Sequence, residues 1–158
     1  MIIGSGLLAS KFSKFKNLNF TIFASGVSNS SEIRISEFTK EENLLRENLS
    51  KEYQKPFVYF SSCDIQNPQL NKKPYYLHKL NMENIIKSSK KDYYIFRLPQ
   101  IVAKGGNKNT LFNFLVDKVK KSEVFEIWLG TQKNILDIDD VYTIVSYILN
   151  TAQTINTT

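Results

Sequence analysis

The residues in this sequence that are best suited to chemistry are a tyrosine and a lysine four positions apart, preceded by two serines. Tyr75 and Lys79 are one helical turn apart, so a helix would place the phenol and the ammonium on one face. Ser61 and Ser62 end an apolar run, where a serine hydroxyl facing that helix is able to hydrogen-bond the Tyr75 phenol. A neighbouring cation lowers the pKa of a phenol, so Lys79 would suit Tyr75 to general acid and base catalysis.

The Tyr75-x-x-x-Lys79 spacing has little weight by itself. The chain contains 8 tyrosines and many more lysines, so a pair at this spacing is expected by chance. The alternative is that Tyr75 packs at the surface and Lys79 is solvated. The position of the pair adds weight, because it opens a predicted helix that follows the strand ending in Ser62.

A second candidate is the glycine turn near the start of the chain. Residues 4–9 read Gly-Ser-Gly-Leu-Leu-Ala and match G-x-G-x-x-A, directly after an apolar run and directly before a helical pattern. Glycines in such a turn let the backbone approach a pyrophosphate, and the helix amino terminus offers free N–H groups. The alternative is a tight turn that binds nothing. The acidic residue expected some 20 positions later is absent, because that strand ends at Ala24, Ser25 and Gly26.

Metal chemistry is not predicted. Cys63 is the only cysteine, and a zinc site would need ligands beyond one cysteine and one histidine. Asp137, Asp139 and Asp140 precede a predicted helix, where carboxylates more often cap the helix or lie in a solvated turn. His78 is interpreted as a surface residue.

Apolar patterns place these candidates on alternating strands and helices. Strands are expected at residues 1–3, 20–24, 56–60, 93–96 and 124–129, and helices at 7–15, 38–49, 74–88, 111–120 and 141–149. Pro74 occupies a favoured first helical position. Strands that alternate with helices need crossover connections, so the sequence predicts an α/β doubly wound parallel sheet covered on both faces.

Length and composition favour a single globular domain over residues 1–150, followed by a polar tail at 151–158. The net charge of +6 comes mostly from scattered lysines, so we expect solvated helix ends and no nucleic-acid partner. This charge would still suit an acidic small molecule, such as a nucleotide sugar. Neither a membrane span nor a secretory signal is found in the sequence, which predicts a cytoplasmic protein.

Taken in order, the motifs resemble the extended short-chain dehydrogenase/reductases, and more narrowly the NAD-dependent epimerase/dehydratases that act on nucleotide sugars. The resemblance covers about residues 1–150 and rests on six landmarks: residues 4–9, 24–26, 57–62, 75–79, 97–102 and 137–141. It implies Ser62, Tyr75 and Lys79 as catalytic residues and NAD or NADP as cofactor. The implied cofactor contacts are Gly4, Ser5, Gly6, Leu7, Leu8, Ala24, Ser25, Gly26, Lys79 and Gln100, the last where the family usually has Asn.

Several features depart from the family pattern. The glycine pattern is not the commoner G-x-x-G-x-x-G, and about ten residues replace the second and third strands expected after the first helix. The expected fold is therefore a Rossmann-like sheet reduced in strand number. Cys63 and Asp64 stand where sugar dehydratases of this family carry an Asp-Glu pair, so a 4,6-dehydratase is disfavoured.

Two functions follow from these motifs. The first is an NAD(P)-dependent nucleotide-sugar epimerase or ketoreductase in which Tyr75 is the acid/base. The second is a degenerate, non-catalytic Rossmann-fold module for binding or assembly, favoured by the missing strands. Whether the chain forms a homodimer is left open by the sequence.

Overall fold

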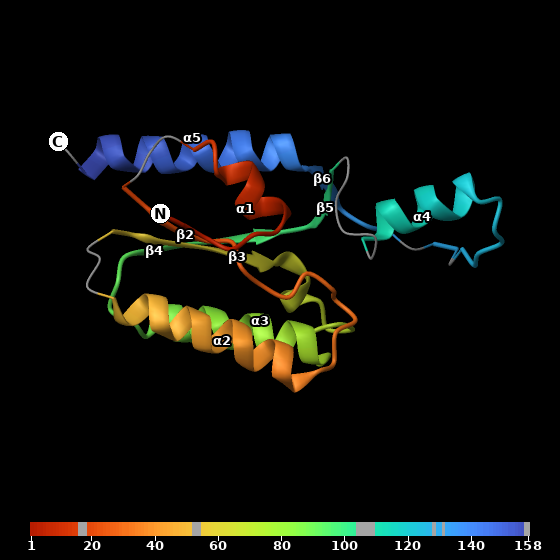
Figure 1. Cartoon of the computed structure of the whole chain (residues 1–158), viewed down its shortest axis with the longest axis horizontal. Coiled ribbons are helices and arrows are strands. Elements are labelled where there is room, and N and C mark those ends of the chain that lie inside the picture. Colours follow the sequence, from red (N-terminus) through yellow and green to blue (C-terminus); the bar gives the residue numbers. More distant parts are fainter. Residues whose placement is uncertain (16–18, 52–54, 104–109, 128, 131, 157–158) are drawn as a thin grey trace.

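The computed structural model describes residues 1–15, 19–51, 55–103, 110–127, 129–130 and 132–156 and places four parallel strands in a central sheet (Figure 1). The strands are β1 (Ile2–Ile3), β2 (Thr21–Phe23), β3 (Phe57–Ser62) and β4 (Tyr93–Leu98), and strands that are consecutive in sequence are neighbours in the sheet. They are connected through α1 (Leu7–Phe12), α2 (Ile35–Ser50) and α3 (Pro74–Lys87). The expected alternation of strands and helices around a parallel sheet is confirmed.

The alternating direction of successive side chains along the strands divides the core into two layers. Val58 and Phe60 of β3 face one cluster, in which Phe12 of α1 and residues of the C-terminal helix are buried. Phe57 and Tyr59 face the opposite cluster, which contains buried residues of α2 and α3. Successive side chains of a strand point to opposite faces, so one short strand supplies both cores.

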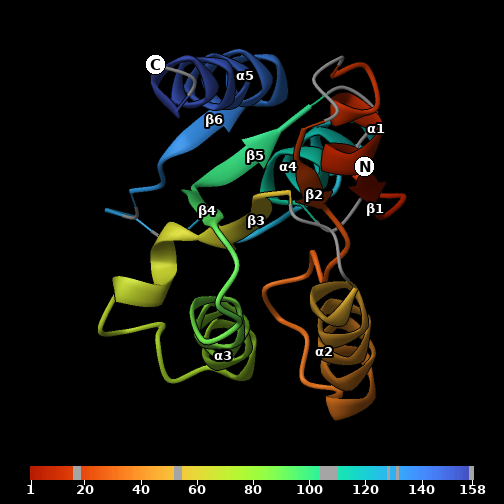
Figure 2. The same ribbon diagram turned by 90° about the vertical axis from the view of Figure 1, so that its left-hand side faces the viewer.

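The first two crossovers place their helices on opposite faces of the sheet. Figures 1 and 2 show α1 on the same side as the C-terminal helix, and α2 and α3 together on the other side. Both crossovers step in the same direction along the strand order, so they have opposite hand. The chain therefore leaves β1 toward one face and β2 toward the other. Ligands of open α/β sheets bind where neighbouring connections diverge in this way.

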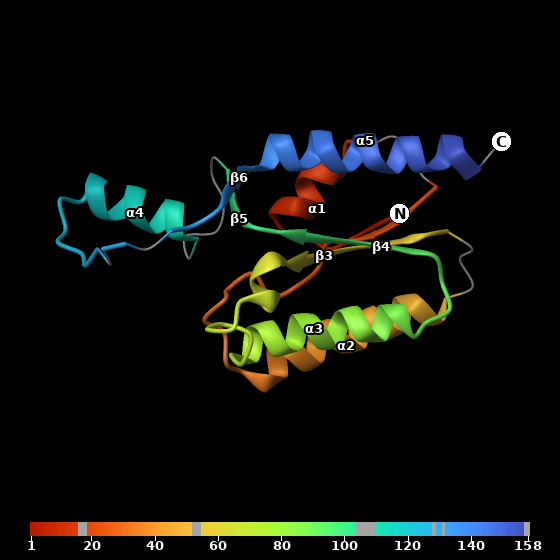
Figure 3. The same cartoon turned by 180° about the vertical axis from the view of Figure 1, so that it is seen from behind.

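Pro99 separates β4 from a second, smaller sheet. β5 (Gln100–Val102) pairs with β6 (Ile135–Asp137) in parallel. Proline has no N–H to donate to a neighbouring strand, which accounts for the break between β4 and β5. The C-terminal helix α5 (Ile138–Asn156) follows β6 directly and packs beside α1 (Figure 3).

The helix α4 (Leu111–Lys120) stands away from the two-layered body in Figures 1 and 3. None of its residues is buried, and Phe112, Phe114 and Val119 are among the exposed apolar side chains. Its position was predicted from the pattern of apolar residues, but the packing that usually accompanies such a pattern is not formed within the described part of the chain.

Several element boundaries differ from the sequence prediction. α1 ends at Phe12, earlier than expected, and α2 begins at Ile35, earlier than expected. The predicted strand at residues 124–129 is wrong, because residues 124–127 form no regular structure and Val124 is exposed. The residues from 151 to 156, predicted as a polar tail, continue α5. The start of α3 at Pro74 is confirmed.

Candidate functional site

The predicted functional segments meet at one edge of the central sheet. The turn after β1, the loop after β2 and the end of β3 all follow the carboxyl ends of parallel strands, which lie at the same edge. The helix α3, with Tyr75 in its first turn and Lys79 in its second, contacts the segment after β3. The fold thus collects residues that are far apart in the sequence.

The two glycines of the first turn have different roles. Gly4 has φ +125°, and a Cβ there would lie 2.5 Å from the Ala24 carbonyl oxygen, so only glycine lets β1 leave the sheet beside the end of β2. Gly6 is the N-cap of α1, and a Cβ there would meet nothing within 4 Å. Gly4, Ser5 and Gly6 are exposed, while Leu7 and Leu8 are half-buried. The open space at Gly6 leaves room for a ligand at the turn.

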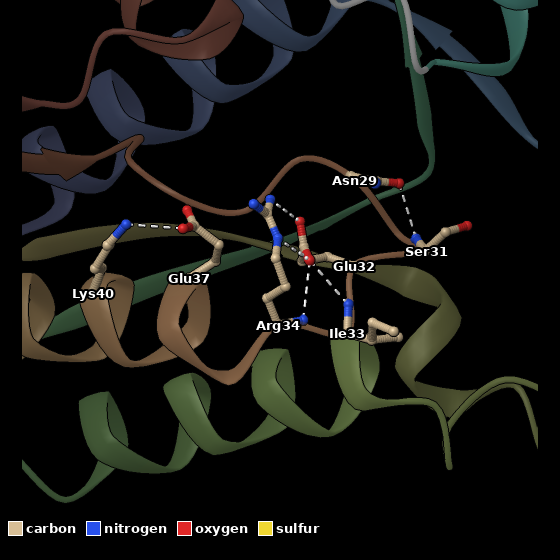
Figure 4. A network of polar contacts seen from close by, with 7 residues as sticks. All are labelled: Asn29, Ser31, Glu32, Ile33, Arg34, Glu37 and Lys40. Carbon is tan, nitrogen blue, oxygen red and sulfur yellow. Dashed lines mark hydrogen bonds and ion pairs between the residues drawn. The ribbon is translucent and has the colours of Figure 1, made fainter.

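The loop after β2 carries the predicted residues Ala24, Ser25 and Gly26 and continues to α2. Its last part is held by the Glu32 carboxylate, which accepts hydrogen bonds from the backbone N–H groups of Ile33 and Arg34 and from the Arg34 guanidinium (Figure 4). These contacts shape the turn that leads into α2, whose side chains then approach the site.

A buried carboxylate is the centre of the site. Glu41 of α2 is 4% exposed, and its Oε1 accepts hydrogen bonds from the Lys79 ammonium at 3.0 Å and from the Tyr59 hydroxyl at 3.3 Å. Its Oε2 accepts a hydrogen bond from the Val27 N–H at 2.8 Å and lies 3.0 Å from Nε2 of His78. The carboxylate therefore joins α2, α3, β3 and the loop after β2.

Gly26 lies directly over this ion pair. A Cβ at that position would be 2.8 Å from Oε1 of Glu41 and 3.1 Å from Nζ of Lys79. Gly26 itself is exposed, so its backbone covers the pair on the solvent side. The absence of a side chain at Gly26 lets the loop close over Lys79.

Charge pairing dominates the protonation of the cluster. Burial would raise the pKa of Glu41, but the Lys79 charge, the His78 hydrogen bond and the Val27 N–H lower it to about 2. Burial opposes the charge of Lys79, yet Tyr59 and Glu41 raise its pKa above the ordinary value. Burial raises the pKa of Tyr59. The cluster is therefore an ammonium and a carboxylate bridged by a neutral phenol at neutral pH.

Tyr75 differs from the prediction in one respect. The Lys79 Nζ lies 5.7 Å from the centroid of the Tyr75 ring, so the two residues are neighbours as expected. However, burial raises the pKa of the Tyr75 phenol, and the negative charges of Glu41 and Asp64 raise it further. The expected lowering by Lys79 is not found, because the ammonium is paired with Glu41 and donates to a different phenol, that of Tyr59.

The serines after β3 face different environments. Ser62 is half-buried, and its Oγ accepts a hydrogen bond from the Asp64 N–H at 3.3 Å as the cap of the short 3-10 helix Cys63–Gln66. Ser61 is buried on the face of the sheet that α3 covers. No hydrogen bond between Ser62 and Tyr75 is formed in the described part of the chain. Gln100 is on β5, beyond the Pro99 break, and its N–H donates to the Asn134 carbonyl.

His78 was interpreted as a surface residue, and this is wrong. It is 7% exposed, stacks on Phe38 with ring centroids 4.7 Å apart, and contacts Glu41. Neither Glu41 nor Tyr59 was predicted as a site residue. A signal existed for Glu41, because it shares the helical stripe of the buried Leu45 and Asn48 of α2.

The expectations on metal binding and on membrane spans can be compared with the described residues. No group of three or more histidine, cysteine or acidic side chains that could hold a metal ion occurs among them. Asp137 accepts a hydrogen bond from the Asp139 N–H, as a capping carboxylate does. No helix in the described ranges combines the length and apolar character needed to cross a membrane.

The site fits a dinucleotide in part. The free space at Gly6, the close backbone packing at Gly4 and the diverging loops after β1 and β2 form the arrangement that admits a pyrophosphate. The nicotinamide side is more closed, because Lys79 is 5% exposed and paired. The glycine turn is therefore open, while Lys79, which the family resemblance assigns to the cofactor ribose, is paired with Glu41.

Comparison with models of known protein families gives no match, and no curated protein matches the sequence. Among solved structures, the chain is similar to the capsular polysaccharide assembling protein CapF from Staphylococcus aureus, with a TM-score of 0.62 and 16% sequence identity. The match covers 89% of this chain and 38% of CapF, so the chain spans less than two fifths of that protein. At this identity the likeness shows the fold, which is Rossmann-like α/β with a reduced parallel sheet.

Proposed function

We propose that this chain is an NAD(P)-dependent enzyme of the short-chain dehydrogenase/reductase type that acts as an epimerase or ketoreductase on a nucleotide sugar. The proposal is carried by the open glycine turn after β1 and the Tyr75–Lys79 pair beside the loop after β2, because the turn and the loop follow the carboxyl ends of neighbouring parallel strands. The similarity to a protein described as assembling capsular polysaccharide supports sugar chemistry as the context.

Each residue has a stated role in this proposal. The backbone at Ser5 and Gly6 would hold the cofactor pyrophosphate, and Lys79 would bind the nicotinamide ribose. The bound nicotinamide supplies hydride exchange with a sugar carbon. Tyr75 would give a proton to, or take one from, the sugar oxygen at its phenolic Oη, and its raised pKa favours the donating form at neutral pH. Ser62 would orient the reacting oxygen.

Cofactor titration and turnover test the proposal together. We expect NADH or NADPH to bind with micromolar or weaker affinity, because the acidic ribose contact is missing from the end of β2. Tyr75→Phe should keep this affinity and lower turnover of a nucleotide sugar by about 10²- to 10⁴-fold. The conservative control is Tyr76→Phe, which alters the adjacent phenol of α3. Equal turnover of Tyr75→Phe and the parent protein would rule out Tyr75 as the acid/base.

A non-catalytic Rossmann-fold module is the second candidate function. It is favoured by the burial of Lys79 in an ion pair with Glu41 and by the short α1 of six residues. In this case the chain would bind a partner or a sugar nucleotide without turnover. Absence of binding for both NADH and NADPH, with a folded protein by circular dichroism, would favour this module over the enzyme.

A further inference from the structure

The Lys79 ammonium has most of its hydrogen-bonding capacity committed inside the protein. Of its three N–H donors, one is directed to Oε1 of Glu41 at 3.0 Å and one to the Tyr59 hydroxyl at 3.2 Å. The side chain also lies against the Tyr59 ring, with Nζ 5.2 Å from the centroid. Lys79 is therefore held by protein groups before any ligand arrives.

The two carboxylate oxygens of Glu41 have separate partners. Oε2 is bound by the Val27 N–H and His78, while Oε1 faces Lys79 and Tyr59. Glu41 would thus keep its position through Oε2 if Lys79 moved away. A carboxylate anchored in this way acts as a fixed competitor for the ammonium.

We propose that Glu41 is a positioning residue that holds Lys79 in its buried site and competes with the cofactor ribose for it, so that Glu41 lowers cofactor affinity. This inference rests on the proposed function, in which Lys79 contacts the ribose. It adds a residue that neither the motifs nor the fold comparison assigns. A residue of α2 then helps to set the affinity of the protein for nicotinamide dinucleotides, although it belongs neither to the glycine turn nor to the Tyr75–Lys79 pair.

Glu41→Gln tests this proposal because it removes the negative charge and keeps the shape of the side chain. The probes are NADH and NADPH, titrated by calorimetry or nucleotide fluorescence. We expect affinity to increase by about tenfold or more, the order of one charge-assisted hydrogen bond. Glu42→Gln is the matched control, because Glu42 is the next residue of α2 and pairs with Arg46 instead. It should leave affinity unchanged.

A double-mutant cycle assigns the effect to Lys79. In a Lys79→Met background, Glu41→Gln should no longer increase affinity, because the ammonium for which Glu41 and the ribose compete is absent. Unchanged or weaker binding by Glu41→Gln in the Lys79-containing protein would overturn the inference while leaving the proposed function intact. Absence of binding by both the parent and Glu41→Gln would overturn the inference and the proposed function together.

A second measurement needs no cofactor. The rate at which Lys79 is acetylated by acetic anhydride, followed by mass spectrometry of its peptide, should rise by roughly tenfold in Glu41→Gln as the ammonium loses its counter-ion. If Glu41→Gln does not fold, Glu41→Asp replaces it in both assays, because the shorter side chain withdraws from Lys79 and keeps its charge. An acetylation rate equal to that of the parent protein would contradict the proposed hold on Lys79.

Discussion

Replacing Lys79 with methionine removes one member of a buried ion pair and leaves the other in place. Glu41 is 4% exposed and Lys79 is 5% exposed, so water replaces little of the lost interaction. In Lys79→Met, the Glu41 carboxylate keeps its contacts with the Val27 N–H and His78 but loses its countercharge at 3.0 Å. The variant should therefore be substantially less stable than the parent protein.

The expected loss follows from the depth of burial. Breaking a buried pair by removing one partner costs about 3 to 5 kcal/mol, because an uncompensated charge remains inside the protein. An exposed pair contributes about 0.2 to 1 kcal/mol. The same chain offers this comparison, since Lys40 and Glu37 of α2 pair at 2.8 Å with 72% and 32% of their side chains exposed (Figure 4).

Urea denaturation at neutral pH measures both effects as free energies of unfolding. Lys79→Met should lose about 3 kcal/mol or more, and the control Lys40→Met less than about 1 kcal/mol. Adding Glu41→Gln to Lys79→Met should recover part of the loss, because the stranded charge is removed. Equal, small losses for the two lysine variants would refute the reasoning that the Glu41–Lys79 pair is buried and charged.

The remaining predictions concern pH and the glycine turn. The Glu41 pKa is lowered from 4.5 to about 2, so its stabilising contribution is present above pH 4.5 and lost as the pH falls toward 2. The free energy of unfolding, measured by urea denaturation at a series of acid pH values, should fall by about 3 kcal/mol over this range. Glu41→Gln should not show this fall. Gly4→Ala should destabilise the protein by about 2 kcal/mol or more, because its Cβ would collide with the Ala24 carbonyl. Gly6→Val should leave the stability near that of the parent protein and abolish dinucleotide binding. Equal thermal midpoints for Gly4→Ala and Gly6→Val would contradict this. If the chain oxidises a sugar, the raised pKa of Tyr75 should make the rate keep rising with pH to above about 10, and a plateau near neutral pH would show that another group is the base.

The sequence by itself determined the order of the four strands of the central sheet and of the helices that connect them. The alternation of apolar runs with helical patterns predicted the parallel sheet, and the period of two along β3 assigns Val58 and Phe60 to one core and Phe57 and Tyr59 to the other. Pro74 marked the start of α3 because its fixed φ suits the first helical position. These features depend on neighbouring residues, and such local patterns are written directly in the sequence.

The glycine turn was located from sequence, but the division of labour within it was not. The family resemblance implied Gly4 and Gly6 alike as cofactor contacts. The structure separates them, because Gly4 packs against the Ala24–Ser25 peptide at a positive φ and Gly6 faces open space. The difference depends on a strand some twenty residues away, whose position relative to the turn is set by sheet pairing.

Only the tertiary structure decided what Lys79 binds. Its main partner, Glu41, is 38 residues away in the sequence, and the two meet because α2 and α3 pack side by side on one face of the sheet. The same packing buries His78, and it raises the pKa of Tyr75 by withdrawing the phenol from water and placing the Glu41 charge nearby. Helical spacing could predict that Tyr75 and Lys79 share a face. It could not predict the electrostatic field at that face, because burial and long-range charge pairs arise only when the helices dock.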